Sequence, residues 1–386
     1  MTRSGKKSFA GLLSDATKSV SRVYQSNFMD SGKQKAIDAL LGNLSTSRKV
    51  YLFNPLDELV RRRLRARSGE FTTRKQVSLW VGTYNLNGKS PSGEDLLQWL
   101  FPSSNLEPAI LAVAFQEIVP LSPGQIMATD PEKKRLWEAH LKQTIASRPN
   151  AKHDYLLLRS GQLVGTALIL FVRTDVVNDI RNVEVATKKT GLRGVAGNKG
   201  GIAIRLDMND TSFCFVTAHL AAGHSNVEER NADYATIASG LVFRRGRTIE
   251  SHDNVIWAAD NNYRISMPNE LVRNLALDDD YVTLMEQDQL IQSMQAGRAF
   301  TGYTEGPLLF RPTYKYDNGT DVYDSSEKQR VPAWTDRILF RGKEVRRQLH
   351  QVHQNSLTSL SFCSWTSTGT IAPSSTRPTI DPSTRL

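Results

Sequence analysis

Short apolar runs alternate with polar stretches along the central part of this chain. Six runs have the length and residue types of strands; they lie at 77–86, 108–119, 167–173, 201–208, 212–220 and 254–260. The segment GEDLLQWLF at 93–101 has helical spacing instead. Strands interspersed with helix, some of them close enough to form hairpins, predict a layered α/β domain.

The two ends of the chain differ from this centre. Residues 34–44 (QKAIDALLGNL) place apolar residues on one side of a predicted helix that ends at Gly42 and Asn43. The last 31 residues, 356–386, contain 15 Ser or Thr and three prolines. Such composition is typical of a disordered tail.

Polar side chains follow four of the predicted strands. Asn85, Glu117 and His219 each stand near the end of such a run, Asp260 ends the run at 254–260, and Asn262 follows that run. Asp and Asn also favour turns, because they bond their own backbone. A single Glu or His at a strand end is more often structural than catalytic. Four polar strand ends together favour a functional site.

These residue types suit metal-assisted phosphoester hydrolysis. Mg²⁺ prefers a carboxylate such as Glu117, with an amide oxygen such as that of Asn85 and several waters. Asp260 is placed as the base that takes a proton from the attacking water. Asn262 and His219 are placed as donors to the charge that develops on the phosphoryl oxygens.

Composition narrows the class of protein. No apolar run approaches the length of a membrane span, and the first residues, MTRSGKKSF, lack the apolar core of a signal peptide. The only cysteines, Cys214 and Cys363, are 149 positions apart, which indicates neither a disulfide framework nor a zinc cluster. We therefore expect a cytoplasmic protein.

The net charge of +10 is distributed unevenly along the chain. Residues 1–75 carry +10 and 341–386 carry +4, so residues 76–340 carry −4. An acidic central domain argues against a nucleic-acid partner. The basic stretch RRRLRAR at 61–67 could meet anionic lipid headgroups or form a solvated helix face, and the sequence leaves both open.

Nine motifs in the centre resemble the inositol polyphosphate 5-phosphatases. They are WVGTYNLNG, FQEIV, GLRGVAGNKGG, TAHLAAG, ERNADY, FRRGRTI, DNNYRI, RPTYKYD and SSEKQRVPAWTDRIL. The resemblance covers about 76–345 and implies the four-layered α/β sandwich of the DNase-I-like superfamily. The stretch at 27–43 and the basic run resemble the end of a Sac1 region in synaptojanin-like proteins. The domains we expect are therefore a basic segment at 1–75, a phosphatase domain at 76–345 and an atypical tail at 346–386.

The resemblance also implies roles for single residues. It assigns metal binding to Glu117 and Asn85, water activation to Asp260, and phosphate binding to Asn262 and His219. It further implies that the substrate is contacted by Asn198, Lys199, Lys315 and Arg330. Considered alone, GVAGNKGG would be a glycine hairpin, and Lys315 and Arg330 would form weak surface ion pairs.

One departure from the family concerns the end of the domain. Family members end with an Asp-His pair, in which the His faces the scissile phosphate, whereas this chain contains no Asp-His dipeptide. Only His350 and His353 follow residue 253, and neither has the expected neighbours. We therefore expect a sandwich that lacks its last strands.

The resulting hypothesis is a Mg²⁺-dependent phosphoinositide 5-phosphatase, acting on phosphatidylinositol 4,5-bisphosphate and related lipids. Its partners would be headgroups at the membrane surface, reached by peripheral contact through the basic segment. The alternative is a catalytically impaired phosphoinositide-binding module. A nuclease of the same superfamily fits less well, because it has no use for the PTYKYD and RVPAW motifs.

Overall fold

The computed structural model describes residues 73–93, 95–102, 107–120, 130–191, 196–317, 319–342, 345–353 and 360–371, together with residues 62, 63 and 66. The chain divides into the units Met1–Ser68 and Gly69–Leu386, and all described strands belong to the second. The helix predicted at 34–44 lies outside the described residues. None of the described helices is long and apolar enough to cross a membrane.

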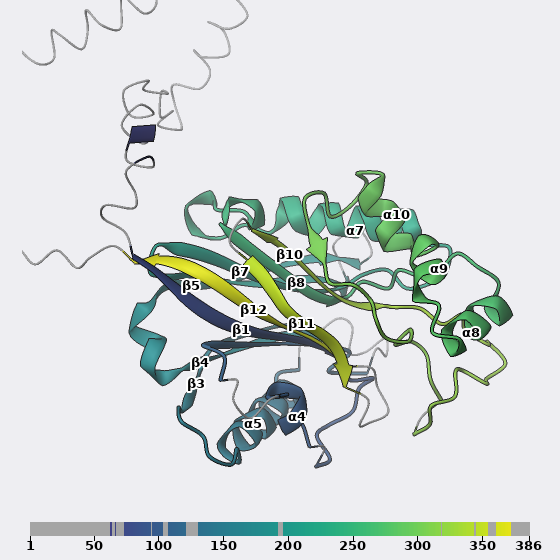
Figure 1. Cartoon of the computed structure of the whole chain (residues 1–386), viewed down its shortest axis with the longest axis horizontal. Helices are drawn as coiled ribbons and strands as arrows, with labels where there is room; N and C mark the ends of the chain where they lie inside the picture. Colours follow the sequence, from purple (N-terminus) through teal and green to yellow (C-terminus); the bar gives the residue numbers. More distant parts are fainter. Residues whose placement is uncertain are drawn as a thin grey trace, which may run out of the picture. The chain divides into compact units, whose positions relative to one another are not determined.

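Two six-stranded sheets form the centre of the second unit (Figure 1). The first has the order β11-β12-β1-β2-β4-β3, built from Val345–His353, Leu360–Ile371, Thr73–Asn85, Ile110–Gln116, Thr166–Arg173 and Tyr155–Leu163. The second has the order β5-β6-β7-β8-β10-β9, built from Ile180–Thr190, Ala196–Met208, Thr211–His219, Asn254–Asp260, Asp336–Gly342 and Thr304–Glu305. All six predicted strands are present.

Helices cover the outer faces of both sheets. The first sheet is covered by α4 (Leu97–Leu100) and α5 (Glu132–Ala146), and the second by α7 (Val227–Gly240) and α10 (Gln289–Gln295) (Figure 1). The remaining helical segments are α8 (Asn269–Leu277), α9 (Tyr281–Glu286), η2 (Thr174–Asp179), η3 (Arg244–Gly246) and η4 (Ile249–Ser251). The helix predicted at 93–101 is shorter than expected, since α4 covers only its last part. These four layers are the predicted sandwich.

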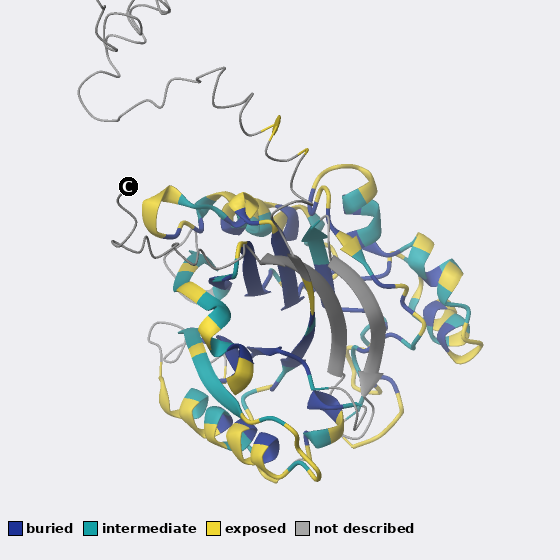
Figure 2. Ribbon diagram, turned by 60° about the vertical axis from the view of Figure 1, so that its left-hand side comes forward, coloured by how far each residue is buried: buried dark blue, intermediate teal, exposed yellow. Residues whose placement is uncertain are grey.

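Alternation along each strand divides the buried residues among the layers. In β8, Ile256 and Ala258 face the core between the sheets, whereas Val255, Trp257 and Ala259 pack under the helices. Such strands are covered on both faces, which explains why they appear in the sequence as continuous apolar runs. Figure 2 shows these strands buried between helices whose outer surfaces are exposed.

The expectation that the sandwich lacks its last strands is wrong. Segments within the predicted tail at 346–386 form β11 and β12, and β12 pairs antiparallel with β1 from Thr73 opposite Ile371 to Thr83 opposite Ser361. Composition misled the prediction, because β1 offers a long edge whose backbone groups need partners whatever side chains the partner strand carries. Residues 372–386 lie outside the described part of the chain.

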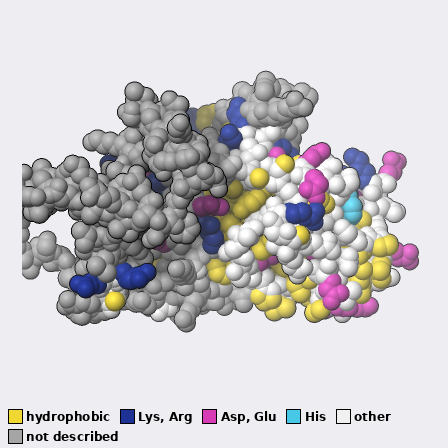
Figure 3. All heavy atoms as spheres, turned by 90° about the horizontal axis from the view of Figure 1, so that it is seen from above, with side chains coloured by type: hydrophobic (Ala, Val, Ile, Leu, Met, Phe, Trp, Pro, Cys, Tyr) yellow, Lys and Arg dark blue, Asp and Glu magenta, His cyan; other side chains and the backbone are white. Residues whose placement is uncertain are grey.

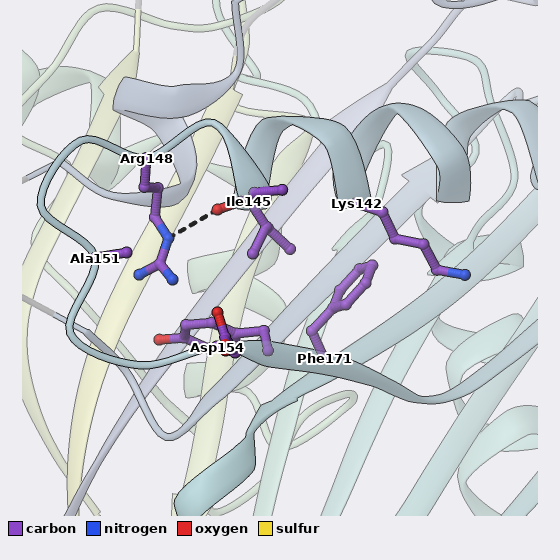
Figure 4. Close-up of a pocket in the computed structure, with 8 residues that line it drawn as sticks. Lys142, Ile145, Arg148, Ala151, Asp154 and Phe171 are labelled. Carbon is purple, nitrogen blue, oxygen red and sulfur yellow. Dashed lines mark hydrogen bonds between the residues drawn. The ribbon is translucent and has the colours of Figure 1, made fainter.

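A cavity of about 110 Å³ lies where α5 meets β3 and β4 (Figure 4). Arg148 fills its rim: its Nε donates to the Ile145 carbonyl at 2.9 Å, and its guanidinium pairs with Glu107 at 3.0 Å. The same group lies 4.4 Å from the ring centre of Phe101 and 4.8 Å from that of Tyr155. These contacts tie the helix end to the sheet, so we interpret this cavity as structural.

Candidate active site

Four of the predicted polar residues come together where the carboxyl ends of parallel strands meet. β1 runs parallel to β2 with Asn85 opposite Gln116, and β7 runs parallel to β8 with His219 opposite Asp260. Asn85 Nδ2 donates to Asp260 Oδ2 at 3.0 Å, from one sheet to the other. His219 Nε2 lies 3.4 Å from the same oxygen and 3.8 Å from Glu117 Oε1.

A buried relay beneath this group holds the sheets in register. Thr83 Oγ1 donates to Gln116 Oε1 at 3.1 Å, and Gln116 Nε2 donates to Thr217 Oγ1 at 2.9 Å. All three side chains are fully buried. Because a buried polar group without a partner is costly, this relay strongly favours one alignment of the two sheets.

Two site residues occupy the left-handed region of backbone conformation, with φ of 47° for Glu117 and 55° for Asn262. Side chains other than glycine rarely adopt it, and such positions gather at functional sites. The turn at Asn262 is fixed further: its N–H donates to Asp260 Oδ1 at 3.1 Å, and Arg264 Nη2 donates to Asn262 Oδ1 at 2.6 Å. Both residues therefore turn the backbone just beyond the ends of β2 and β8.

Three carboxyl groups crowd this end of the molecule. Burial, and then the neighbouring charge of Asp260, raises the pKa of Glu117, while burial raises the pKa of Asp260. The third group, Asp336, was not among the predicted site residues, although it lies in the quoted motif RVPAWTDRIL. It stands opposite Asp260 on the antiparallel pair β8 and β10, and burial and the charge of Asp260 raise its pKa well above the ordinary value. Thr335 Oγ1 donates to Asp336 Oδ2 at 3.0 Å.

Lys199 provides positive charge beside these carboxylates. Burial lowers its pKa to about 8, against the opposing effect of Asp260 and Glu117. Because that value remains above neutrality, the amine is mainly charged at pH 7. Asn198 precedes it in β6, but only the backbone of Asn198 is described.

His219 is a neutral imidazole at physiological pH. Burial, and then the positive charges of Lys199 and Arg264, lowers its pKa well below the ordinary value. Its Nδ1 is buried and has no hydrogen-bond partner in the described part of the chain. The distances of Nε2 to the two carboxylates exceed those of strong hydrogen bonds, so this nitrogen can turn to a ligand oxygen.

The predicted headgroup contacts lie in one connected loop. The Lys315 carbonyl accepts the Asp324 N–H at 2.8 Å, and Asp324 Oδ2 accepts both the backbone N–H and Nη1 of Arg330 at 3.0 Å. The charge of Lys315 acts on Glu117, where it opposes part of the rise in pKa that burial and Asp260 cause. The guanidinium of Arg264 lies 4.2 Å from the ring centre of Tyr314, which connects the loop to Asn262.

The donor set fits the expected magnesium ion. Within the described residues, no three His, Cys, Asp or Glu side chains form a ready-made metal cage. Mg²⁺ does not need one, since it keeps several waters and uses one or two carboxylates. Burial raises the pKa values of Glu117 and Asp260 even though Lys199 and, for Asp260, Arg264 favour the ionised forms, so the ionised pair can accept further positive charge. A divalent cation beside Glu117 and Asn85 would provide it.

Comparisons with known proteins match the part of the chain that carries these residues. The family described as endonuclease/exonuclease/phosphatase family 2 matches residues 82–365. The inositol polyphosphate 5-phosphatase domain of SPsynaptojanin, solved with inositol (1,4)-bisphosphate and calcium ion, is 44% identical, with a TM-score of 0.76; the match covers 83% of this chain and 93% of that one.

Longer relatives match over nearly the whole chain. Inositol-1,4,5-trisphosphate 5-phosphatase 1 of Schizosaccharomyces pombe is 50% identical over 344 residues, which are 89% of this chain and 32% of the relative. Human Synaptojanin-1 is 40% identical over 367 residues, 86% of this chain and 23% of the relative. The chain thus spans a third or less of the length of these two relatives.

Proposed function

The chain belongs to the inositol polyphosphate 5-phosphatase family, and from that premise we propose that it removes the 5-phosphate of phosphatidylinositol 4,5-bisphosphate and related polyphosphoinositides with the help of Mg²⁺. The observation that carries the proposal is the contact between the two sheets. An amide from one sheet and a carboxylate from the other are joined by a hydrogen bond, and the neutral His219 lies 3.4 Å from that carboxylate and 3.8 Å from Glu117.

The residues of the site suit an in-line attack by water on phosphorus. Asp260 accepts hydrogen bonds from Asn85 and from the N–H of Asn262, which orient its carboxylate. Burial raises the pKa of Asp260 toward that of an effective general base at neutral pH. Asp260 therefore takes the proton of the attacking water. His219 Nε2–H and the amine of Lys199 then donate to the phosphoryl oxygens as negative charge develops on them.

Glu117 and Asn85 would hold the metal ion, which when bound polarises the phosphoryl oxygen and offsets negative charge. Lys315 and Arg330 would bind a second phosphate on the ring, because Asp324 links them in one loop and the charge of Lys315 acts on Glu117. In this assignment selectivity depends on the position of these two cations. The test is phosphate release from short-chain phosphatidylinositol 4,5-bisphosphate, with Mg²⁺ and with a chelator. No release above background under either condition would contradict the proposed activity.

We further propose that this chain is slower than a family member with the Asp-His pair. One donor to the transition state is missing, and removal of such a donor costs roughly 10² to 10³ in rate. In the structure His353 stands opposite Leu360, and Ser361 stands opposite Thr83, so the backbone of His353 lies at the end of β1 that bears Asn85. This backbone position makes His353, rather than His350, our candidate for a compensating group.

A chimera that replaces residues 351–386 by a family-like ending with Asp-His tests this second proposal. We expect the chimera to turn over substrate roughly 10² to 10³ times faster, which is the factor that such a donor contributes. Equal turnover would show that the defect is overrated. If His353→Ala then removed the remaining activity, His353 would be the group that compensates.

The alternative function is a phosphoinositide-binding module without effective catalysis. The absence of an Asp-His dipeptide favours it, since the cations of the headgroup loop are present. Headgroup binding by this chain without detectable Mg²⁺-dependent release of phosphate would support this alternative. On the face that Figure 3 shows, the described acidic and basic side chains are interspersed.

Membrane association and a cytoplasmic location remain part of the proposal. Of the basic run 61–67, the structure describes residues 62, 63 and 66, which are helical and exposed. Exposed arginines attract anionic lipid by roughly 1 kcal/mol each near the surface. Replacing the five arginines of this run by glutamine should therefore weaken sedimentation with phosphatidylserine vesicles; unchanged sedimentation would exclude this role.

A further inference from the structure

A second cavity lies on the sheet formed by β5, β6, β7, β8, β10 and β9, at the opposite end of its strands from the candidate active site. Its volume is about 220 Å³, and it is lined by Asn182, Val183, Glu184, Arg205, Arg244, Arg245 and Arg247. Five positions along β6 separate Arg205 from Gly200, the residue opposite His219. At 3.3 Å per residue this places the cavity about 17 Å from the catalytic group. None of its lining residues belongs to the site described above.

The deepest arginine of this cavity is already neutralised by the protein. Arg205 is 2% exposed; its Nη1 pairs with Glu184 at 3.2 Å, and its Nη2 pairs with Asp207. Its Nε donates to His252 Nε2 at 3.0 Å. Arg247 shares Asp207, at 3.6 Å. Arg205 therefore engages both carboxylates near the cavity, and Arg247 engages one of them.

Two further arginines have no such counter-charge. Arg244 and Arg245 are exposed, and within the described residues neither guanidinium has an ion-pair partner. The loop that carries them turns sharply, with φ of 58° at Arg245 and 71° at Gly246. The N–H of Arg244 donates to Glu184 Oε2 at 2.8 Å, which fixes this turn against β5. Folding thus gathers positive charge around a cavity without neutralising it.

We propose that this cavity binds the phosphate group of a phosphomonoester, separately from the catalytic site. Arginine presents a planar fork of donors that matches phosphate oxygens two at a time. A phosphomonoester carries close to two negative charges and three acceptor oxygens, which is what two unpaired guanidiniums and a third shared one can satisfy. The volume is several times the roughly 30 Å³ of one water, so the group that bears the phosphate also fits.

The proposal does not depend on the proposed catalytic function, because it uses other residues at the opposite end of the sheet. The phosphate could belong to a soluble compound or to a lipid headgroup. Inositol 1,4-bisphosphate serves as the soluble probe, and phosphatidylcholine vesicles containing phosphatidylinositol 4-phosphate serve as the lipid probe. Neither carries a 5-phosphate, so neither is consumed by the proposed reaction.

Hydrogen exchange of the full chain distinguishes the two sites by position. We expect the soluble probe to slow exchange in two separate segments, 241–253 at the cavity and 311–330 at the headgroup loop. In the variant R244A/R245A the probe affinity read from 241–253 should fall at least tenfold, while protection of 311–330 stays. The variant R135A/R181A is the matched control, since it removes two exposed arginines that do not line the cavity.

The outcomes separate clearly. Absence of protection at 241–253 in the unmodified chain, or equal loss in the control, would overturn the proposal. The variant R244K/R245K keeps the charge but not the fork, and full binding by it would overturn the role of guanidinium geometry. Protection by inositol 1,4-bisphosphate but not by vesicles would assign the site to soluble compounds, and protection by vesicles to headgroups.

Discussion

The two ends of the β5 to β10 sheet differ in the sign of the charge that folding leaves unbalanced. At the carboxyl ends of β7 and β8, three carboxyl groups, those of Glu117, Asp260 and Asp336, lie near two cations, Lys199 and Arg264. At the opposite end, four arginines line one cavity together with a single carboxylate.

Charges buried only for structural reasons are paired within the protein. Arg337, for example, pairs with Asp288 at 2.9 Å and also with Glu305. The contrast teaches that partial neutralisation marks a binding site. The acidic end is suited to a cation, and the basic end to an anion.

The largest effect is expected at the acidic end. Asp260→Asn keeps the shape of the side chain but removes the base, so the rate of phosphate release should fall by about 10² or more. Asp253→Asn is the matched control at the far end of β8, where the carboxylate accepts from the N–H and Oγ of Ser212. If both variants lost activity equally, the division of labour between the two ends would be refuted.

At the basic end the largest effect should be on stability. Arg205→Ala leaves Glu184 and Asp207 without their buried partner, which should lower the free energy of unfolding by about 3 kcal/mol. Urea denaturation measures it, with Arg181→Ala as an exposed control that should change stability by less than about 0.5 kcal/mol. Similar losses in the two variants would contradict the proposed burial of charge.

This loss should depend on pH in a defined direction. Burial acts to raise the pKa of Asp207, but hydrogen bonds from Asn182 and Arg205 hold it below the ordinary value. A lowered pKa stabilises the folded chain above the unfolded value, near 3.9, and the contribution disappears as pH falls through the folded value. The difference between Arg205→Ala and the unmodified chain should therefore shrink in acid. A constant difference down to the acid transition would argue against this pairing.

A metal ion should stabilise only the acidic end. A ligand at a hundredfold excess over its dissociation constant stabilises the folded state by about 2.7 kcal/mol. We expect Mg²⁺ to raise the melting temperature of the unmodified chain and of R244A/R245A, and a chelator to reverse the rise. Glu117→Gln should abolish it. Full stabilisation of that variant by Mg²⁺ would show that Glu117 does not hold the metal.

The smallest effect should come from the unpaired arginines. Without ligand, R244A/R245A should change the free energy of unfolding by no more than about 0.5 kcal/mol, because exposed side chains without partners contribute little. Relief of like-charge repulsion should raise stability slightly at low salt. A loss comparable with that of Arg205→Ala would mean that these two arginines are structural.

Much of the catalytic end could be predicted from the sequence. An apolar run that ends in a polar residue predicts both the strand and the residue at its exit, and Asn85, His219 and Asp260 stand at the last positions of their strands. Glu117 follows directly after β2. These features are local, because strand alternation and exit depend on neighbouring residues.

Asp336 was missed because nothing local distinguishes it from a structural aspartate in a strand. Its relation to Asp260 comes from the antiparallel pairing of β8 and β10, whose strands are separated by more than seventy residues. The cavity lined by Arg205, Arg244, Arg245 and Arg247 was missed for the same reason. Pairing of β5 with β6 puts Glu184 opposite Arg205, and a hydrogen bond joins Glu184 to the distant loop at 244–247. Neither the role of Asp336 nor this cavity could be predicted from residue types along the chain.

The sequence by itself determined the strands, their polar exits and the family, because each depends on spacing along the chain. The tertiary structure alone decided which exits share a site, how burial shifts their pKa values, and where charge remains unpaired. It also decided that a segment rich in Ser and Thr forms β12, because the exposed edge of β1 requires backbone partners. Pairing and burial join residues distant along the chain, and their energies exist only once the chain has folded.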